Sequence, residues 1–124
     1  MTPAKWTRVC ALTQLVPERG VPALVDGEPV ALFLLDDGTV HAVGHHDPFS
    51  NANVMARGIV GSVGEGDAYR DTVASPMYKQ VFDLASGECL SEPGQRLPVW
   101  AVRVVEDHVE VARREVDPAH GGAP

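Results

Sequence analysis

Short runs of alternating apolar and polar residues, separated by glycine, aspartate and proline, make up most of the chain. Such alternation is typical of half-buried strands. The predicted strands are Trp6–Cys10, Val21–Val25, Pro29–Leu35, Thr39–Val43, Ile59–Val60, Tyr69–Ala74, Gln80–Leu84, Val99–Val105 and His108–Val111. Between them, Asp26-Gly27-Glu28, Asp36-Asp37-Gly38 and Glu106-Asp107 are typical of hairpin turns. The pattern therefore predicts a largely antiparallel β-fold.

The middle of the chain, residues 44–66, is rich in glycine and shows no sustained helical period. We expect a loop there, with one helical turn around Ser50–Met55. Residues 113–124 are polar and contain glycine and proline, so they predict a loose tail. The prediction is one all-β domain over residues 5–112, built as an antiparallel sandwich or a small barrel.

The composition of the chain limits the classes of partner that it can bind. The chain has 124 residues, a net charge of -7 and no cluster of lysine or arginine, which argues against nucleic acid or an anionic membrane as partner. No apolar run approaches the roughly 20 residues of a spanning helix, and the N-terminus lacks the apolar region of a secretion signal. We expect a cytoplasmic protein, in which Cys10 and Cys89 are small buried side chains rather than a disulfide.

Two short motifs point to function. One is Asp47-Pro48-Phe49, and the other is Ser75-Pro76-Met77-Tyr78, followed by Phe82-Asp83 and Gly87. Their surroundings resemble the two cluster-binding loops of a Rieske iron–sulfur domain, which read C-P-H and C-P-x-H and bind a [2Fe–2S] centre. The resemblance implies a Rieske-like fold with two hairpin loops at the cluster site. The four ligand positions, however, hold Asp47, Phe49, Ser75 and Tyr78. A phenyl ring cannot bind iron, and neutral hydroxyls replace thiolate and imidazole poorly.

A narrower resemblance rests on Asp47-Pro48-Phe49, Arg57-Gly58-Ile59 and Ala74–Gln80 taken in order. This set is similar to the small subunit of assimilatory NAD(P)H-dependent nitrite reductases. The resemblance implies a partner, the large subunit, which carries FAD, the NAD(P)H site, a [4Fe–4S] cluster and sirohaem and reduces nitrite to ammonium. The chain itself has no G-x-G-x-x-G motif and no set of four cysteines. We therefore expect no cofactor, metal or catalytic residue in it, and a structural or docking role.

The degenerate loops leave two roles open. Asp47 can accept backbone N–H bonds in a turn, while Phe49 fills the vacated volume by packing against Tyr78 or Met77. Alternatively, Pro48, Phe49, Met77 and Tyr78 form an apolar patch that docks on the large subunit, because aromatic residues and methionine are enriched in interface cores.

Two other functions are compatible with the residues. Asp47 with His41, His45 and His46 supplies ligands for a non-standard metal, as in a Rieske-type ferredoxin that transfers electrons. If residues 41–45 are extended, His41 and His45 share a face and His46 takes the other, so surface or capping histidines are the simpler interpretation. The third candidate is a stand-alone β-sandwich interaction module. Nucleophilic catalysis is disfavoured, because Ser75 lacks a G-x-S-x-G context.

Overall fold

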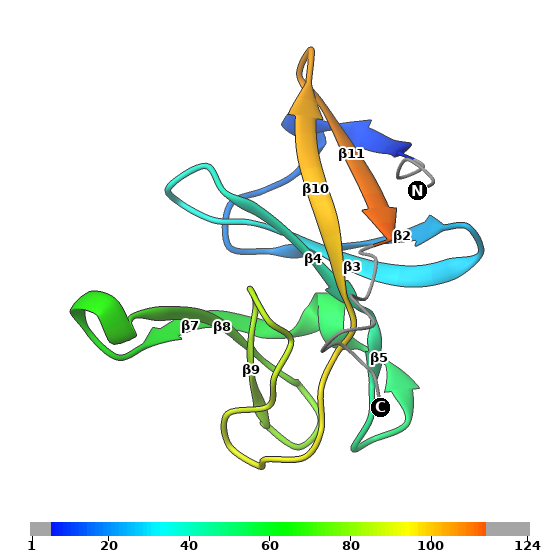
Figure 1. Ribbon diagram of the computed structural model, residues 1–124. Coiled ribbons are helices and arrows are strands. Elements are labelled where there is room, and N and C mark those ends of the chain that lie inside the picture. The colour runs from blue at the N-terminus through cyan, green and yellow to red at the C-terminus, as the bar shows by residue number, and fades with distance from the viewer. Residues whose placement is uncertain (1–5, 114–124) are drawn as a thin grey trace, which may run out of the picture.

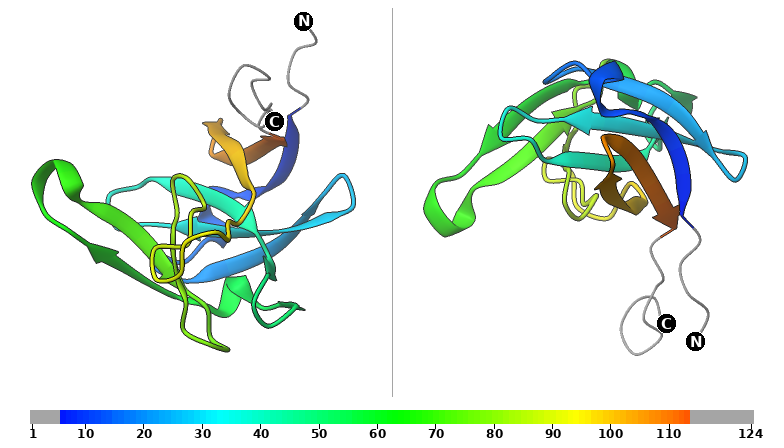
Figure 2. Two further views of the ribbon diagram at one scale, coloured as in Figure 1. Left: turned by 60° about the horizontal axis from the view of Figure 1, so that its bottom comes forward. Right: turned by 90° about the horizontal axis from the view of Figure 1, so that it is seen from above.

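A curled antiparallel sheet forms the larger part of the molecule. The structure is a computed structural model and describes residues 6–113 (Figure 1). The six strands of the sheet follow the order β1-β11-β10-β4-β3-β2. They are β1 (Thr7–Ala11), β2 (Gly20–Val25), β3 (Glu28–Leu34), β4 (Val40–Gly44), β10 (Val99–Val105) and β11 (His108–Arg113). The sheet curls until it is nearly closed, like a barrel (Figure 2).

A smaller sheet and a short hairpin complete the fold. The three-stranded sheet has the order β7-β8-β9 and contains β7 (Ile59–Val63), β8 (Arg70–Ala74) and β9 (Val81–Asp83). The hairpin pairs β5 (His46–Asp47) with β6 (Ala52–Asn53). Single 3-10 turns are η1 (Leu12–Gln14), η2 (Met55–Arg57) and η3 (Gly66–Ala68). Among residues 6–113, no helix has the length and apolar character needed to cross a membrane.

The all-β prediction is confirmed, and its hairpins lie where the turn residues indicated. Val25 pairs with Glu28, and Val105 with His108. The second turn consists of Glu106 and Asp107, both with positive φ (51° and 62°). Two consecutive residues of this kind match the right-handed twist of the flanking strands.

The middle of the chain differs from its prediction. A helical turn over Ser50–Met55 is wrong, because Asn51 adopts a φ of 59° and donates its N–H to the Asp47 carbonyl at 2.8 Å. That bond closes the β5–β6 hairpin, and the 3-10 turn η2 begins only at Met55. The strand expected at Ile59–Val60 extends to Val63. Of the predicted tail, residue 113 is the last residue of β11, and residues 114–124 lie outside the described residues.

Two clusters of buried side chains meet at β3. Val30 and Leu32 belong to the cluster inside the six-stranded sheet, whereas Ala31 and Phe33 belong to the cluster shared with the smaller sheet. All four are 0% exposed, because β3 is covered on both faces. The second cluster includes Phe82 of β9 and therefore holds the smaller sheet against the larger one.

Glycine permits two close approaches near the smaller sheet. A Cβ at Gly58 would lie 2.6 Å from the carbonyl oxygen of Ala74, so only glycine lets β7 begin beside the end of β8. Gly87 has a φ of 79°, and a Cβ there would lie 2.0 Å from the carbonyl oxygen of Leu97. These contacts fix the course of the chain around the two loops that carry the candidate site.

Candidate functional site

The carboxylate of Asp47 organises the first loop. It is 0% exposed, at the end of β5. Its Oδ1 accepts the N–H of Phe49 at 2.9 Å, and its Oδ2 accepts the hydroxyl of Ser50 at 2.9 Å. Pro48, between Asp47 and Phe49, has a fixed φ, which favours this tight turn. The turn predicted for Asp47 and Pro48 is confirmed.

The hydroxyl of Ser75 joins the second loop to the first. Ser75 is 0% exposed, and its Oγ donates to Oδ2 of Asp47 at 2.5 Å. The same Oγ accepts the N–H of Met77 at 3.2 Å. Residues 28 positions apart in the sequence are thus in direct contact, and two of the four degenerate ligand positions are bonded to each other.

The hydrogen bonds around Asp47 hold it in the charged form. Burial by itself raises the pKa of Asp47, but the bonds from Ser75, Phe49 and Ser50 outweigh burial, and the pKa is lowered from its ordinary value. An ionised carboxylate accepts all three bonds without carrying a proton of its own. A negative charge is therefore present between the loops at neutral pH.

The two aromatic replacements lie in different surroundings. Phe49 is half-buried and packs against the core, with its ring 6.2 Å from that of Phe82, centroid to centroid. Tyr78 is 60% exposed and Met77 is 53% exposed. The aromatic partner of Phe49 is thus Phe82, and its packing against Tyr78 or Met77 stays a prediction.

This donor set does not fit a [2Fe–2S] cluster. The Asp47 carboxylate and the Ser75 hydroxyl are engaged with each other, and Phe49 offers no ligand atom. The fourth position, Tyr78, is a phenol on a mainly exposed side chain.

The three histidines do not converge on Asp47. His45 uses Nδ1 to accept the N–H of Ala56 at 3.1 Å, and His46 uses Nδ1 in a 3.0 Å bond with Asn53 across the β5–β6 pair. His41 lies on β4, in another hollow. Burial and the neighbouring positive charge of Arg57 lower the pKa of His45. Within residues 6–113, no group of three or more His, Cys, Asp or Glu side chains is placed to hold a metal ion.

The cysteines are apart as well. Cys10 is half-buried, Cys89 is buried, and both are free thiols. Burial raises the pKa of the Cys10 thiol. Both thiols therefore behave as packing groups, and Cys10 is less buried than expected.

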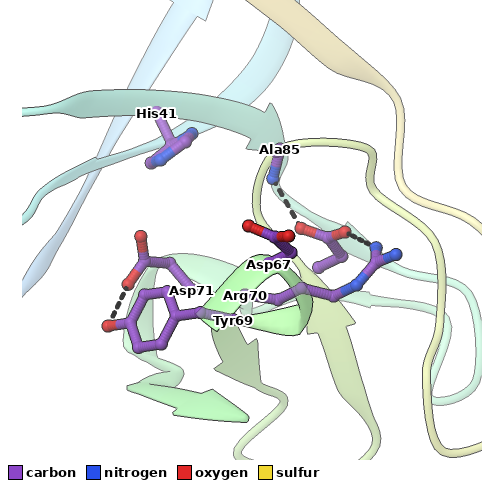
Figure 3. Close-up of a pocket in the computed structure, with 7 residues that line it drawn as sticks. His41, Asp67, Tyr69, Arg70, Asp71 and Ala85 are labelled. Atoms are coloured by element: carbon purple, nitrogen blue, oxygen red, sulfur yellow. Dashed lines mark hydrogen bonds and ion pairs between the residues drawn. The ribbon is translucent and has the colours of Figure 1, made fainter. Parts of the chain in front are cut away.

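A hollow of about 300 Å³ lies between β4 and the start of β8. Figure 3 shows His41 on one wall, opposite Tyr69 and Asp71, whose side chains are joined by a 3.0 Å hydrogen bond. Burial lowers the pKa of His41, and the negative charges of Asp71, Asp37 and Asp83 oppose that effect. The rest of the lining is Asp67, Arg70, Asp83 and Ala85.

Asp83 in this hollow is a second buried carboxylate. It is 3% exposed, accepts the N–H of Ala85 at 2.9 Å and the Ser86 hydroxyl at 3.2 Å, and forms a 2.5 Å ion pair with Arg70. In the sequence, Asp83 stands out only as part of the Phe82-Asp83 pair that follows the second motif. A signal was available, because serine follows both Asp47 and Asp83 at the third position.

Comparisons with known proteins identify relatives of this fold. The family model of the Rieske-like [2Fe-2S] domain matches residues 5–112. The nitrite reductase (NADH) small subunit of Salmonella typhimurium is 32% identical over 109 residues, covering 87% of this chain and 97% of that protein. A crystal structure of a candidate NADH-dependent nitrite reductase small subunit from Mycobacterium tuberculosis is 50% identical, with a TM-score of 0.82, covering 93% of this chain and 100% of that one.

One relative carries the similarity inside a larger polypeptide. The nitrite reductase [NAD(P)H] large subunit of Klebsiella oxytoca is 31% identical over 111 residues, which cover 90% of this chain and 11% of that protein. Since family model, full-length relatives and fold agree, this chain belongs to the Rieske-like family of nitrite reductase small subunits, with other residues at the cluster-ligand positions.

Proposed function

We propose that this chain is the small subunit of a cytoplasmic NAD(P)H-dependent nitrite reductase and that it docks on the large subunit without taking part in electron transfer. In this proposal FAD, the NAD(P)H site, the [4Fe–4S] cluster and sirohaem all belong to the large subunit. The Klebsiella relative supports such a partnership, since a domain similar to this chain is part of a protein named as a large subunit.

The hydrogen bond between Asp47 and Ser75 carries the proposal. In a Rieske domain a metal cluster joins the two loops. Here the Ser75 hydroxyl and the Asp47 carboxylate join them instead, and this pair has no accessible redox couple. A carboxylate and an aliphatic hydroxyl do not exchange electrons at biological potentials, whereas a [2Fe–2S] centre does. The loops are therefore kept in place for a purpose other than carrying electrons.

The docking surface that we propose is the tip formed by Pro48, Phe49, Met77 and Tyr78. Met77 and Tyr78 are more than half exposed on a loop whose base is fixed by Ser75. Phe49 contributes less, because its ring packs against Phe82. An exposed methionine beside an exposed tyrosine on a fixed turn is the composition of an interface core.

A binding experiment tests the docking role. The M77A/Y78A variant and the wild-type chain are titrated with the purified large subunit, and we expect a Kd at least about tenfold weaker for the variant. The matched control is L24A/V104A, which removes apolar side chains of 69% and 45% exposure from the six-stranded sheet. Equal binding by all three chains would remove the tip as a docking surface.

The runner-up function, a ferredoxin with a non-standard metal, predicts a different sample. It requires His41, His45 and His46 to move from their present positions onto one ion. Purified chain should be colourless and hold less than about 0.1 iron per chain, as expected of a protein without a cluster. A visible absorption band with stoichiometric iron would favour the electron carrier. Failure to co-purify with the large subunit would instead favour the stand-alone interaction module.

A further inference from the structure

In the six-stranded and three-stranded sheets of the described residues, every edge strand except one carries a feature that discourages further pairing. Edge strand β2 contains Pro22, which has no N–H to donate. Edge strand β1 is bulged between Arg8 and Cys10. Strand β9 is covered by the chain after it, since Leu90 donates its N–H to Val81 at 2.7 Å. Charged residues, proline and bulges are the usual means of protecting an edge.

Strand β7 is the exception. Its sequence, Ile-Val-Gly-Ser-Val over Ile59–Val63, contains no charge and no proline, and its pairing with β8 has no register shift. Among residues 6–113, β7 makes backbone hydrogen bonds to β8 and to no other segment. Figure 2 shows the far end of the β7–β8 hairpin extending beyond the rest of the molecule.

The two faces of β7 differ in chemistry. Ile59 is 62% exposed and Val63 is 42% exposed, and the strand period places both on one face. Val60 and Ser62, on the opposite face, line a groove of about 250 Å³ that reaches the β3–β4 turn. One side of the edge is thus apolar, and the other opens onto the groove.

The groove is acidic. Its lining includes the carboxylates of Glu18, Asp36, Asp37 and Asp71, and no lysine or arginine. Within the described residues, none of these four carboxylates forms an ion pair with lysine or arginine. His41 is near enough to feel the charges of Asp37 and Asp71, but burial lowers its pKa and thus favours its neutral form. The groove therefore presents negative charge without a compensating side chain.

We propose that β7 accepts an extended segment of the large subunit as an added strand, with apolar side chains against Ile59 and Val63 and lysine or arginine side chains over the groove. The inference rests on the proposed function and adds its second contact surface. A strand that alternates apolar and basic residues satisfies both faces of β7 at once, because successive side chains point in opposite directions.

Charge selects this partner over a second copy of the chain. Pairing β7 with β7 of another copy brings two acidic grooves together, on chains that each carry a net charge of -7. Like charges opposed across an interface are unfavourable. A basic strand removes the same repulsion and gains complementary contacts.

The position of β7 also fits a joint interface with the tip. Ile59, at the start of β7, pairs with Ala74, the residue that precedes Ser75. The free edge therefore begins where the second loop leaves the sheet, and one partner can contact both surfaces.

Hydrogen–deuterium exchange of the reconstituted complex tests strand addition directly. Backbone amides of residues 59–63 should exchange at least about tenfold more slowly when the large subunit is bound, because an added strand pairs with the free N–H groups. Amides of β2, an edge that contains Pro22, are the internal control and should be unchanged. Protection that develops in the isolated chain as its concentration rises would identify a second copy as the occupant and overturn the inference.

Paired variants give an independent measurement. I59K/V63K places lysines on the free edge and brings positive charge beside the groove, and we expect it to bind the large subunit at least about tenfold more weakly than wild type. L24K/V104K makes matched changes at exposed positions of the other sheet and should bind like wild type. Circular dichroism and thermal melting confirm that both variants are folded.

The D36K/D37K variant tests the contribution of the groove's negative charge to binding, because both side chains are exposed on a turn and their replacement leaves strand β7 unchanged. Its binding should be weaker at low salt and less dependent on salt than that of the wild type.

The outcomes distinguish the two proposals. Wild type that fails to bind the large subunit overturns the proposed function and this inference with it. Wild type that binds, with M77A/Y78A weakened and I59K/V63K unchanged, overturns only the added strand. Weakening by I59K/V63K together with slow exchange over β7 supports it.

Discussion

Asp47 and Asp83 begin the same four-residue pattern, Asp-x-x-Ser, in two different sheets. Each accepts the N–H two residues later and the serine hydroxyl three residues later. Each is almost completely buried, and each has a lowered pKa although burial alone raises it. The local turn is thus shared, and the difference lies in the third partner.

That third partner decides what each carboxylate connects. Asp83 is bonded to Arg70 of β8, a strand with which β9 is already paired through Thr72 and Asp83. Asp47 is bonded to Ser75, on a loop that shares no strand pairing with its own. The first bond reinforces a sheet, whereas the second creates a junction. The buried, neutral hydroxyl of Ser75 joins two loops through Asp47, whereas the half-exposed, charged Arg70 binds Asp83 within one sheet.

Removing each carboxylate should give the largest effects, with Asp47 the greater. D47A leaves three donors without their acceptor, the Ser75 hydroxyl among them fully buried, and should lower the free energy of unfolding by about 3 kcal/mol. D83A should lower it by about 2 kcal/mol, because Arg70, which is 50% exposed, can turn to water. Urea unfolding measures both, with D47N and D83N as isosteric controls. A larger loss for D83A would reverse the comparison.

Removing the third partner alone should give intermediate effects. S75A deletes a buried donor to a carboxylate and should cost about 1.5 kcal/mol. R70A removes a half-exposed ion pair and should cost about 0.5 kcal/mol, less at high salt. Unfolding at low and high salt checks the pair of values. Salt sensitivity in S75A, or its absence in R70A, would contradict the assignment of a neutral and a charged partner.

Acid should weaken both sites in the same direction. A carboxyl with a lowered pKa stabilises the fold fully above its unfolded pKa of about 3.9, and this contribution is lost as the pH falls toward the lowered value. The free energy of unfolding should therefore decrease as the pH is lowered below about 4. Carboxyl NMR titration should show S75A raising the pKa of Asp47 alone and R70A raising that of Asp83 alone. A shift of both by either variant would mean that the two sites are coupled.

The tip should matter least to stability. M77A and Y78A remove side chains that are 53% and 60% exposed, so each should change the free energy of unfolding by less than about 0.5 kcal/mol. F49A, whose ring meets Phe82, should cost more than either. Thermal melting of the three variants separates the packed part of the tip from the exposed part.

The sequence allowed the local features to be predicted. Asp26-Gly27, Asp36-Asp37-Gly38 and Glu106-Asp107 mark hairpins because their residues favour tight turns, and the strands on either side follow from alternation. The turn at Asp47 and Pro48 follows from the same local chemistry.

Contacts between distant segments were not predictable in this way. Nothing in the alternation of β1 indicates that it pairs with β11, or that Ser75 reaches Asp47. The helical turn expected at Ser50–Met55 failed for a related reason, because the backbone bond from Asn51 to Asp47 favours a hairpin. Local propensity is a weak guide where a buried polar group organises the chain.

The pairing of β1 with β11 has a consequence for how such a domain is built into larger proteins. Thr7 lies opposite Val111, so the chain enters and leaves the fold at neighbouring points. A host polypeptide can therefore accommodate the unit through two adjacent connections, without stretching it. Connections made at the ends of β1 and β11 leave the Asp47–Ser75 hydrogen bond unchanged, so the fold can be inserted into a longer chain as a unit.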